Sequence, residues 1–153
     1  CALPISQFYY DASLGQYKMA QYYSSLGSYR DTIDENNDQQ LMFDNVIVLF
    51  TDIHTYPGHE AKDLQYAEYS WGGVGYYCYG GKIEKIRWEK GTPLESLRLV
   101  TFDNQEPFKI NCGKSYVTVV DIDEAERFEW EPLATAQDTQ EAPTSETFVE
   151  SDD

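Results

Sequence analysis

The stretch Asn45-Val-Ile-Val-Leu-Phe-Thr51 decides the fold, because every residue after the asparagine is apolar or β-branched. A short apolar run of this kind predicts a β-strand that is covered on both faces. No window longer than about ten residues keeps the helical period of roughly 3.6 residues. We therefore expect short helices at most, within residues 61–69 or 123–130.

Shorter segments rich in β-branched or aromatic residues flank this run, with turn residues between them. They cover residues 8–10, 17–23, 75–79, 82–88, 96–102 and 115–120. Residues 31–40, with the sequence DTIDENNDQQ, are polar and predict a solvated loop. We expect an all-β or mostly β fold, a small antiparallel sandwich or barrel-like sheet, formed by a single domain over residues 1–131.

Negative charge is concentrated at the C-terminal end of the chain. Residues 1–120 contribute −5 and residues 121–153 contribute −11 to the formal net charge of −16. Residues 132–153 contain few large apolar side chains and predict a disordered acidic tail. Just before this tail, Phe128 and Trp130 are expected to dock on the sheet, because burial of an aromatic ring is strongly favourable.

The same charge distribution restricts the partners. No cluster of Lys and Arg is present, which argues against nucleic acid and against an anionic membrane surface. No apolar run approaches the roughly 18 residues that indicate a transmembrane segment.

Both histidines lie in the segment TDIHTYPGHE, residues 51–60. It holds four residues of metal-binding type within nine positions: Asp52, His54, His59 and Glu60. They form a metal site only if the turn at Pro57-Gly58 brings both histidines and a carboxylate together. A polar, exposed turn at the end of the buried strand explains the same residues without a metal. The alternative function that this cluster suggests is a metal-assisted hydrolase.

Aromatic residues are numerous, with 13 Tyr, 7 Phe and 3 Trp in 153 residues. Exposed aromatic rings form platforms for sugars or peptides, whereas in β proteins they more often fill the core. The candidate binding residues are Tyr76, Tyr77, Tyr79 and Trp88. Alternation along a strand places Tyr77 and Tyr79 on one face and Tyr76 and Cys78 on the other. No complete catalytic constellation accompanies them, so we expect a non-enzymatic protein without a cofactor.

The three cysteines, Cys1, Cys78 and Cys112, leave at least one unpaired. Cys78 and Cys112 lie in strand-like runs, where a free cysteine is expected to be a small buried side chain. A disulfide between them is the alternative. The chain begins at Cys1 without an initiator methionine, which indicates a processed or trimmed product. Cys1 itself fits a processing product, a lipid-bearing cysteine or a trimmed end.

A series of motifs between residues 45 and 121 resembles the C-terminal domain of the YerB-like family, lipoproteins of Gram-positive bacteria with a domain of unknown function. The motifs are Asn45-Val-Ile-Val-Leu, Gly73-Val-Gly75-Tyr-Tyr, Gly80-Gly-Lys82, Ile86-Arg-Trp88-Glu-Lys90, Phe102-Asp-Asn and Ile110-Asn-Cys-Gly113-Lys-Ser-Tyr116-Val. The chain departs from the family at Cys112, where members usually have proline, so Cys112 is not expected to be a catalytic residue of the family.

The resemblance implies a function class but no site residues. It implies an exported lipoprotein of the cell envelope. Together with the aromatic-rich strands and the lack of a complete catalytic constellation, it leads us to expect a non-enzymatic binding or scaffold domain. The expected location is extracellular or at the cell surface, with membrane anchoring through the parent lipoprotein. The expected partners are an envelope protein or polysaccharide and a preceding N-terminal domain of the parent.

Overall fold

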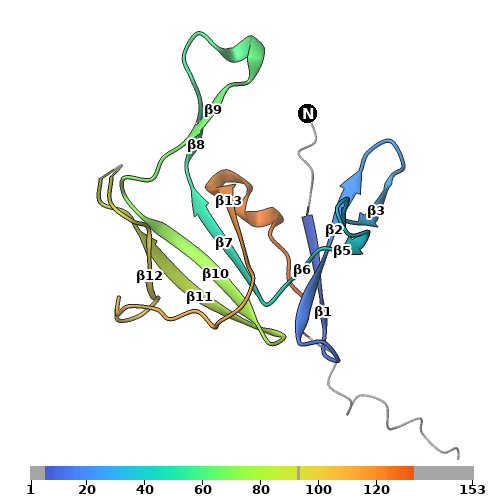
Figure 1. The fold of residues 1–153 in the computed structure, drawn as a ribbon. Coiled ribbons are helices and arrows are strands. Elements are labelled where there is room, and N and C mark those ends of the chain that lie inside the picture. The colour runs from blue at the N-terminus through green and yellow to red at the C-terminus, as the bar shows by residue number, and fades with distance from the viewer. Residues whose placement is uncertain (1–5, 93, 133–153) are drawn as a thin grey trace, which may run out of the picture.

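A five-stranded sheet forms the main body of the domain in the computed structural model, which describes residues 6–92 and 94–132 (Figure 1). The strand order is β12-β11-β10-β7-β13. The strands are β7 (Asn45–Thr51), β10 (Gly73–Tyr79), β11 (Lys82–Glu89), β12 (Arg98–Thr101) and β13 (Ser115–Asp121). This sheet confirms the all-β fold. Its neighbours are antiparallel except β13, which runs parallel to β7.

A second sheet is built from the N-terminal segments. It contains β1 (Ser6–Asp11), β2 (Gln16–Tyr23) and β3 (Ser28–Asp31), and β6 (Met42–Phe43) pairs with β2. A small hairpin follows β3, formed by β4 (Ile33–Asp34) and β5 (Gln39–Gln40).

The prediction of a solvated loop over residues 31–40 is therefore wrong at both ends of the segment. Only residues 35–38 form the turn of the β4–β5 hairpin. Two backbone hydrogen bonds, from Thr32 N–H to Met19 C=O and from Met19 N–H to Leu41 C=O, connect the hairpin to β2. Backbone pairing overrides polar composition here, because a strand needs partners for its amide groups as much as apolar side chains.

Strand β7 is buried on both faces, as its sequence predicts. All seven of its residues are buried. Ile47 and Leu49 pack on one face, in a cluster with Tyr77, Ile86 and Trp88. Val46, Val48 and Phe50 pack on the other face, where side chains of β1, β2 and the C-terminal segment cover them. The two layers of the fold thus meet on the second face.

The only helices in the described part of the chain are two short 3₁₀ helices, η1 (Glu60–Lys62) and η2 (Ile122–Arg127). The Asp121 carboxylate caps η2 by accepting a hydrogen bond from Asp123 N–H. Residues 65–67, inside one predicted helical window, form strand β9 (Gln65–Ala67) instead. No helix among the described residues is long and apolar enough to cross a membrane. The predicted disordered tail covers residues 132–153, and all of it after Pro132 lies outside the described residues.

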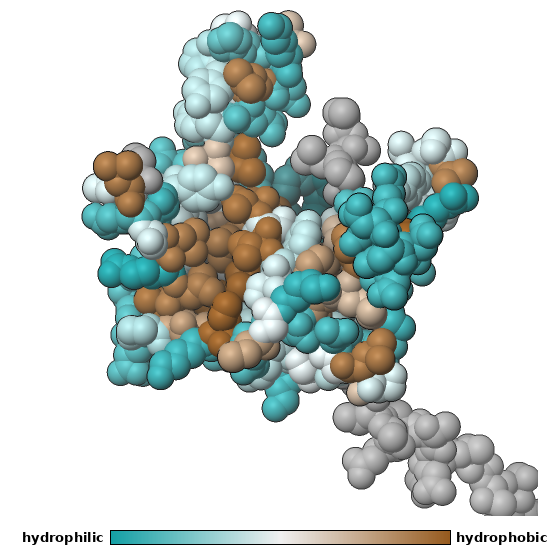
Figure 2. All heavy atoms as spheres, viewed as in Figure 1, coloured by the Kyte–Doolittle hydropathy of each residue, from teal (hydrophilic) through white to brown (hydrophobic). Residues whose placement is uncertain are grey.

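A hairpin of β8 (Ile53–Thr55) and β9 projects from the end of β7, away from the two sheets (Figure 1). The Thr51 hydroxyl donates a hydrogen bond to Glu68 C=O, and Glu68 N–H donates to Asp52 C=O, which closes the base of the hairpin. Figure 2 shows hydrophobic residues gathered over the five-stranded sheet, whereas hydrophilic residues predominate on this hairpin and over β2 and β3.

Candidate functional site

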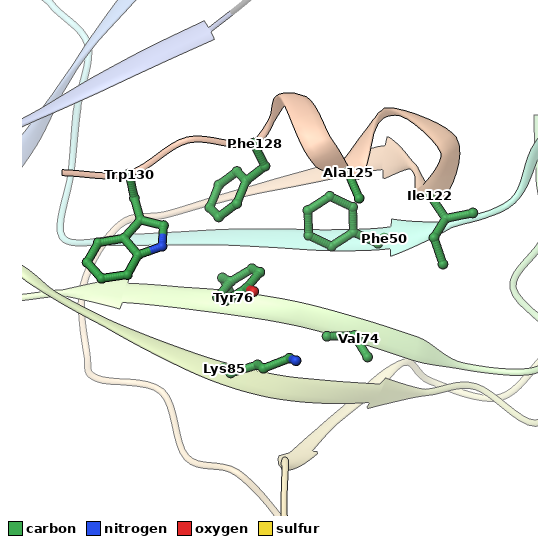
Figure 3. A pocket seen from close by; sticks show the side chains of 8 residues that line it. All are labelled: Phe50, Val74, Tyr76, Lys85, Ile122, Ala125, Phe128 and Trp130. Atoms are coloured by element: carbon green, nitrogen blue, oxygen red, sulfur yellow. The ribbon is translucent and has the colours of Figure 1, made fainter.

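A groove of about 240 Å³ lies between η2 and the five-stranded sheet (Figure 3). Its walls come from β7, β10 and β11 on one side and from η2 and the residues after it on the other. The lining residues are Phe50, Val74, Tyr76, Lys85, Ile122, Ala125, Phe128 and Trp130. Most of these side chains are apolar or aromatic, which suits a ligand with a ring or an aliphatic group.

The alternation of β10 supplies the floor of the groove. Val74 and Tyr76 point to the same face as Phe50 of β7, since the register pairs Gly75 with Leu49 and Tyr76 with Val48. Gly75 allows the two strands to approach, because a Cβ at this position would lie 2.6 Å from the Val48 carbonyl oxygen. This close approach explains one glycine of the motif at residues 73–75.

Phe128 fixes the residues after η2 onto the sheet. Its ring stacks on Tyr76, with centroids 4.9 Å apart and an interplanar angle of 21°, and meets Phe50 edge-on at 5.7 Å. The prediction that Phe128 docks on the sheet is confirmed. Trp130 lies two residues further on, at one end of the groove, and remains 56% exposed (Figure 3).

Lys85 lines the β11 side of the groove, and Arg87 lies two residues further along the same face of β11. Register places Lys85 beside Tyr76 and Arg87 beside Val74. Both cations lie over the ring of Phe102, with the Lys85 Nζ 4.4 Å and the Arg87 Cζ 4.6 Å from its centroid. The Arg87 Nε also donates a hydrogen bond to Phe102 C=O at 3.1 Å. Sequence analysis did not single out this pair, although alternation over residues 82–88 puts both side chains on one face.

The four predicted binding residues divide between groove and core. Tyr76 lines the groove. Tyr77 and Trp88 are each 1% exposed and belong to the core, where the Trp88 Nε1 donates a hydrogen bond to Phe50 C=O at 3.0 Å. Tyr79 stacks on Tyr77 with centroids 4.9 Å apart. The predicted division of the tyrosines between two faces is confirmed, and it leaves Tyr76 as the one that faces the groove.

The predicted metal-binding residues lie on the projecting hairpin and at its base. Asp52 separates β7 from β8, and the His54 ring packs 5.5 Å from the Tyr66 ring across the hairpin. His59 lies in the connecting loop, where its backbone N–H donates to Tyr56 C=O. In residues 6–92 and 94–132, no group of three or more His, Cys, Asp or Glu side chains could hold a metal ion. The side chain of Glu60 lies outside the described part of the structure.

Cys78 and Cys112 are free thiols, so no bridge joins them. Cys112 is exposed, contrary to the expectation of a buried side chain. Cys78 lies partly buried on the face of β10 that also carries Tyr76, and burial raises the pKa of its thiol to about 11. Cys78 therefore lacks the exposure and low pKa of a catalytic nucleophile. Cys1 lies outside the described residues.

Comparison with known proteins identifies the fold. Residues 2–117 match the sequence model of the family described as "Protein of unknown function (DUF3048) C-terminal domain". The crystal structure of the YerB protein from Bacillus subtilis is similar, with a TM-score of 0.61 and 15% sequence identity over 76% of this chain. The chain spans 36% of the YerB chain. No curated protein matches the chain. These findings confirm the resemblance to the YerB-like family.

Proposed function

The chain belongs to the DUF3048 C-terminal domain family, and from this premise we propose that it is a non-enzymatic binding domain of an exported protein of the bacterial cell envelope. The observation that carries the proposal is the groove beneath η2. A ligand there contacts the exposed indole of Trp130 and the ring of Tyr76, neither of which belongs to the fully buried core. Exposed aromatic rings at the edge of a pocket are typical of binding sites.

The proposed setting is the cell surface, with the parent protein anchored as a lipoprotein and a preceding N-terminal domain beside this one. The partial coverage of YerB supports the presence of further structure in the parent, since this chain corresponds to 36% of that protein. The proposed partner is an envelope polysaccharide or an envelope protein that inserts a ring into the groove.

Retention of the purified domain on immobilised cell-envelope fractions tests this proposal. We expect Trp130→Ala to lower retention at least several-fold, because it removes the exposed ring while leaving the Phe128 contact in place. Trp71→Ala is the matched control, since Trp71 is 89% exposed and does not line the groove. A folded domain that is retained by no polysaccharide or protein fraction would overturn the proposal.

A further inference from the structure

Lys85 and Arg87 are an unusual pair for an acidic chain. They stand two residues apart on the same face of β11, and both contact the ring of Phe102. The ion pairs formed between described residues are Lys18–Asp11, Arg98–Glu89 and Arg127–Glu124, and neither Lys85 nor Arg87 takes part in one. Two adjacent cations therefore lack a carboxylate in a protein with a net charge of −16.

The pair lies along the groove rather than apart from it. Lys85 is itself a lining residue, and its neighbour across the strand is Tyr76. Arg87 is the neighbour of Val74, the next groove residue along β10. Phe102 and the hydrogen bond to its carbonyl group hold the guanidinium in place. A ligand in the groove thus meets Lys85 on the sheet side and the Trp130 ring at one end (Figure 3), with Arg87 next to Lys85 on the same face of β11.

The carboxylates of the opposite side lie outside the groove lining, because the η2 residues that line the groove are the apolar Ile122 and Ala125. The carboxylates of η2 and its cap are Asp121, Asp123, Glu124 and Glu126. Two of them are engaged locally, because Asp121 accepts the Asp123 N–H and Glu124 pairs with Arg127. The charged residue of the groove lining is Lys85, so a negative group on a ligand is attracted to the β11 side of the groove.

We propose that the groove binds an anionic saccharide, with a sugar ring on Trp130 and a carboxylate or phosphate group on Lys85 and Arg87. The inference rests on the proposed function and names the ligand class. Indole rings stack on the C–H face of a sugar, and a guanidinium offers two donors to a planar or tetrahedral anion. A neutral glycan makes only the stacking contact with Trp130, whereas an acidic peptide makes only the ionic contact with Lys85 and Arg87.

Titration calorimetry with defined polymers tests the proposal. To test a carboxylate ligand, we compare polygalacturonate with its neutral methyl ester. To test a phosphate ligand, we compare phosphomannan with unphosphorylated mannan. Polyglutamate supplies negative charge without a sugar. We expect at least one anionic glycan to bind more tightly than its neutral counterpart, in a salt-dependent manner.

Variants separate the two contacts. Lys85→Gln and Arg87→Gln, each removing a charge-assisted hydrogen bond, should weaken binding of the anionic glycan about tenfold. Trp130→Ala should weaken both forms of the glycan. Lys82→Gln is the matched control, because Lys82 lies on the same strand with its side chain on the other face. Lys85 is exposed, so its variant should fold normally even if the Arg87 variant does not.

Three results would overturn the inference: equal binding of charged and neutral glycans, equal binding of polyglutamate, or no effect of Lys85→Gln and Arg87→Gln. A folded domain that binds none of the polymers also overturns it. The proposed function is then tested separately: retention by envelope protein fractions that is lost in Trp130→Ala supports it even if no glycan binds.

Discussion

The Tyr77 hydroxyl donates a hydrogen bond of 2.6 Å to the Asn45 side-chain carbonyl, and both residues are at most 1% exposed. The same hydroxyl accepts a hydrogen bond from Asn111 N–H at 2.8 Å. The Asn45 amide donates in turn to Asn111 C=O and to the Ser115 hydroxyl. This network joins β7 and β10 to the loop that leads into β13, and so it places the parallel strand beside β7.

Tyr77→Phe should destabilise the domain by about 1–3 kcal/mol, because it leaves the Asn45 carbonyl and the Asn111 N–H without their buried partner. Urea unfolding followed by tryptophan fluorescence measures the change. Tyr79→Phe is the control, since that hydroxyl makes no hydrogen bond to another described residue. Equal losses for the two variants would contradict a special role for the network.

Gly75→Ala should destabilise far more than Gly15→Ala. At residue 75 the added Cβ would lie 2.6 Å from a backbone oxygen of β7, so the two central strands must separate. At residue 15 the space around the added Cβ is open, and only the positive φ of 69° opposes the change. This backbone strain costs about 1 kcal/mol of stability. Midpoints of thermal unfolding compare the variants. A well-folded Gly75→Ala protein with a nearly unchanged midpoint would refute the packing argument.

Alkaline pH should destabilise the domain through Cys78. Burial raises the pKa of this thiol from 9.0 to about 11, so between these values the unfolded chain loses the proton while the folded chain keeps it. The contribution of Cys78 to the free energy of unfolding is therefore fully present below pH 9 and falls as the pH rises toward 11. At pH 10 the loss is about 1 kcal/mol.

Urea unfolding at pH 8 and pH 10 tests this linkage in a Cys1→Ser, Cys112→Ser background. Adding Cys78→Ala should lower stability at both pH values but reduce the difference between them. Tyr17, whose pKa is raised to about 12 by burial and then by the neighbouring Cys78, contributes in the same direction at higher pH, and Cys78→Ala also reduces that contribution. An identical pH dependence with and without Cys78 would rule out the thiol as its source.

The projecting hairpin should be dispensable for folding. Replacing residues 54–66 by Asn-Gly removes few core contacts and retains the base at Thr51 and Glu68, so stability should change by about 1 kcal/mol or less. The same variant lacks His54, His59 and Glu60. Elemental analysis of the two proteins, purified without chelators, then tests the predicted metal site, and a metal present only in the intact protein would establish it.

The strands were predictable from local sequence, because β7, β10, β11 and β13 each combine length, apolar pattern and turn residues at their ends. The parallel direction of β13 was not, since it depends on Asn45 and Tyr77 meeting Asn111 across long separations in the chain. The same limit explains the polar segment at residues 31–40, whose strands form through backbone pairing and through side-chain hydrogen bonds such as that from Gln40 to Met19 C=O.

The candidate site was predictable only in part. Alternation correctly separated Tyr76 from Tyr77 and Tyr79, but it did not state which face lies beneath η2. The contact of Lys85 and Arg87 with Phe102 could not be predicted, because Phe102 lies in the turn after β12 and reaches them only in the folded sheet. The histidines suggested a metal site because imidazole is a common metal ligand. Their placement on a projecting hairpin could not be predicted, because it depends on the pairing of β8 with β9.

The most direct test of the central claim is the mapping of backbone amide chemical shifts during titration of the folded domain with envelope polysaccharide and envelope protein fractions. If the ligand binds in the groove, the largest chemical-shift changes fall on Val74, Tyr76, Lys85 and Trp130, and Trp130→Ala suppresses them. Shifts confined to the β8–β9 hairpin, or no shifts with any fraction, would contradict it.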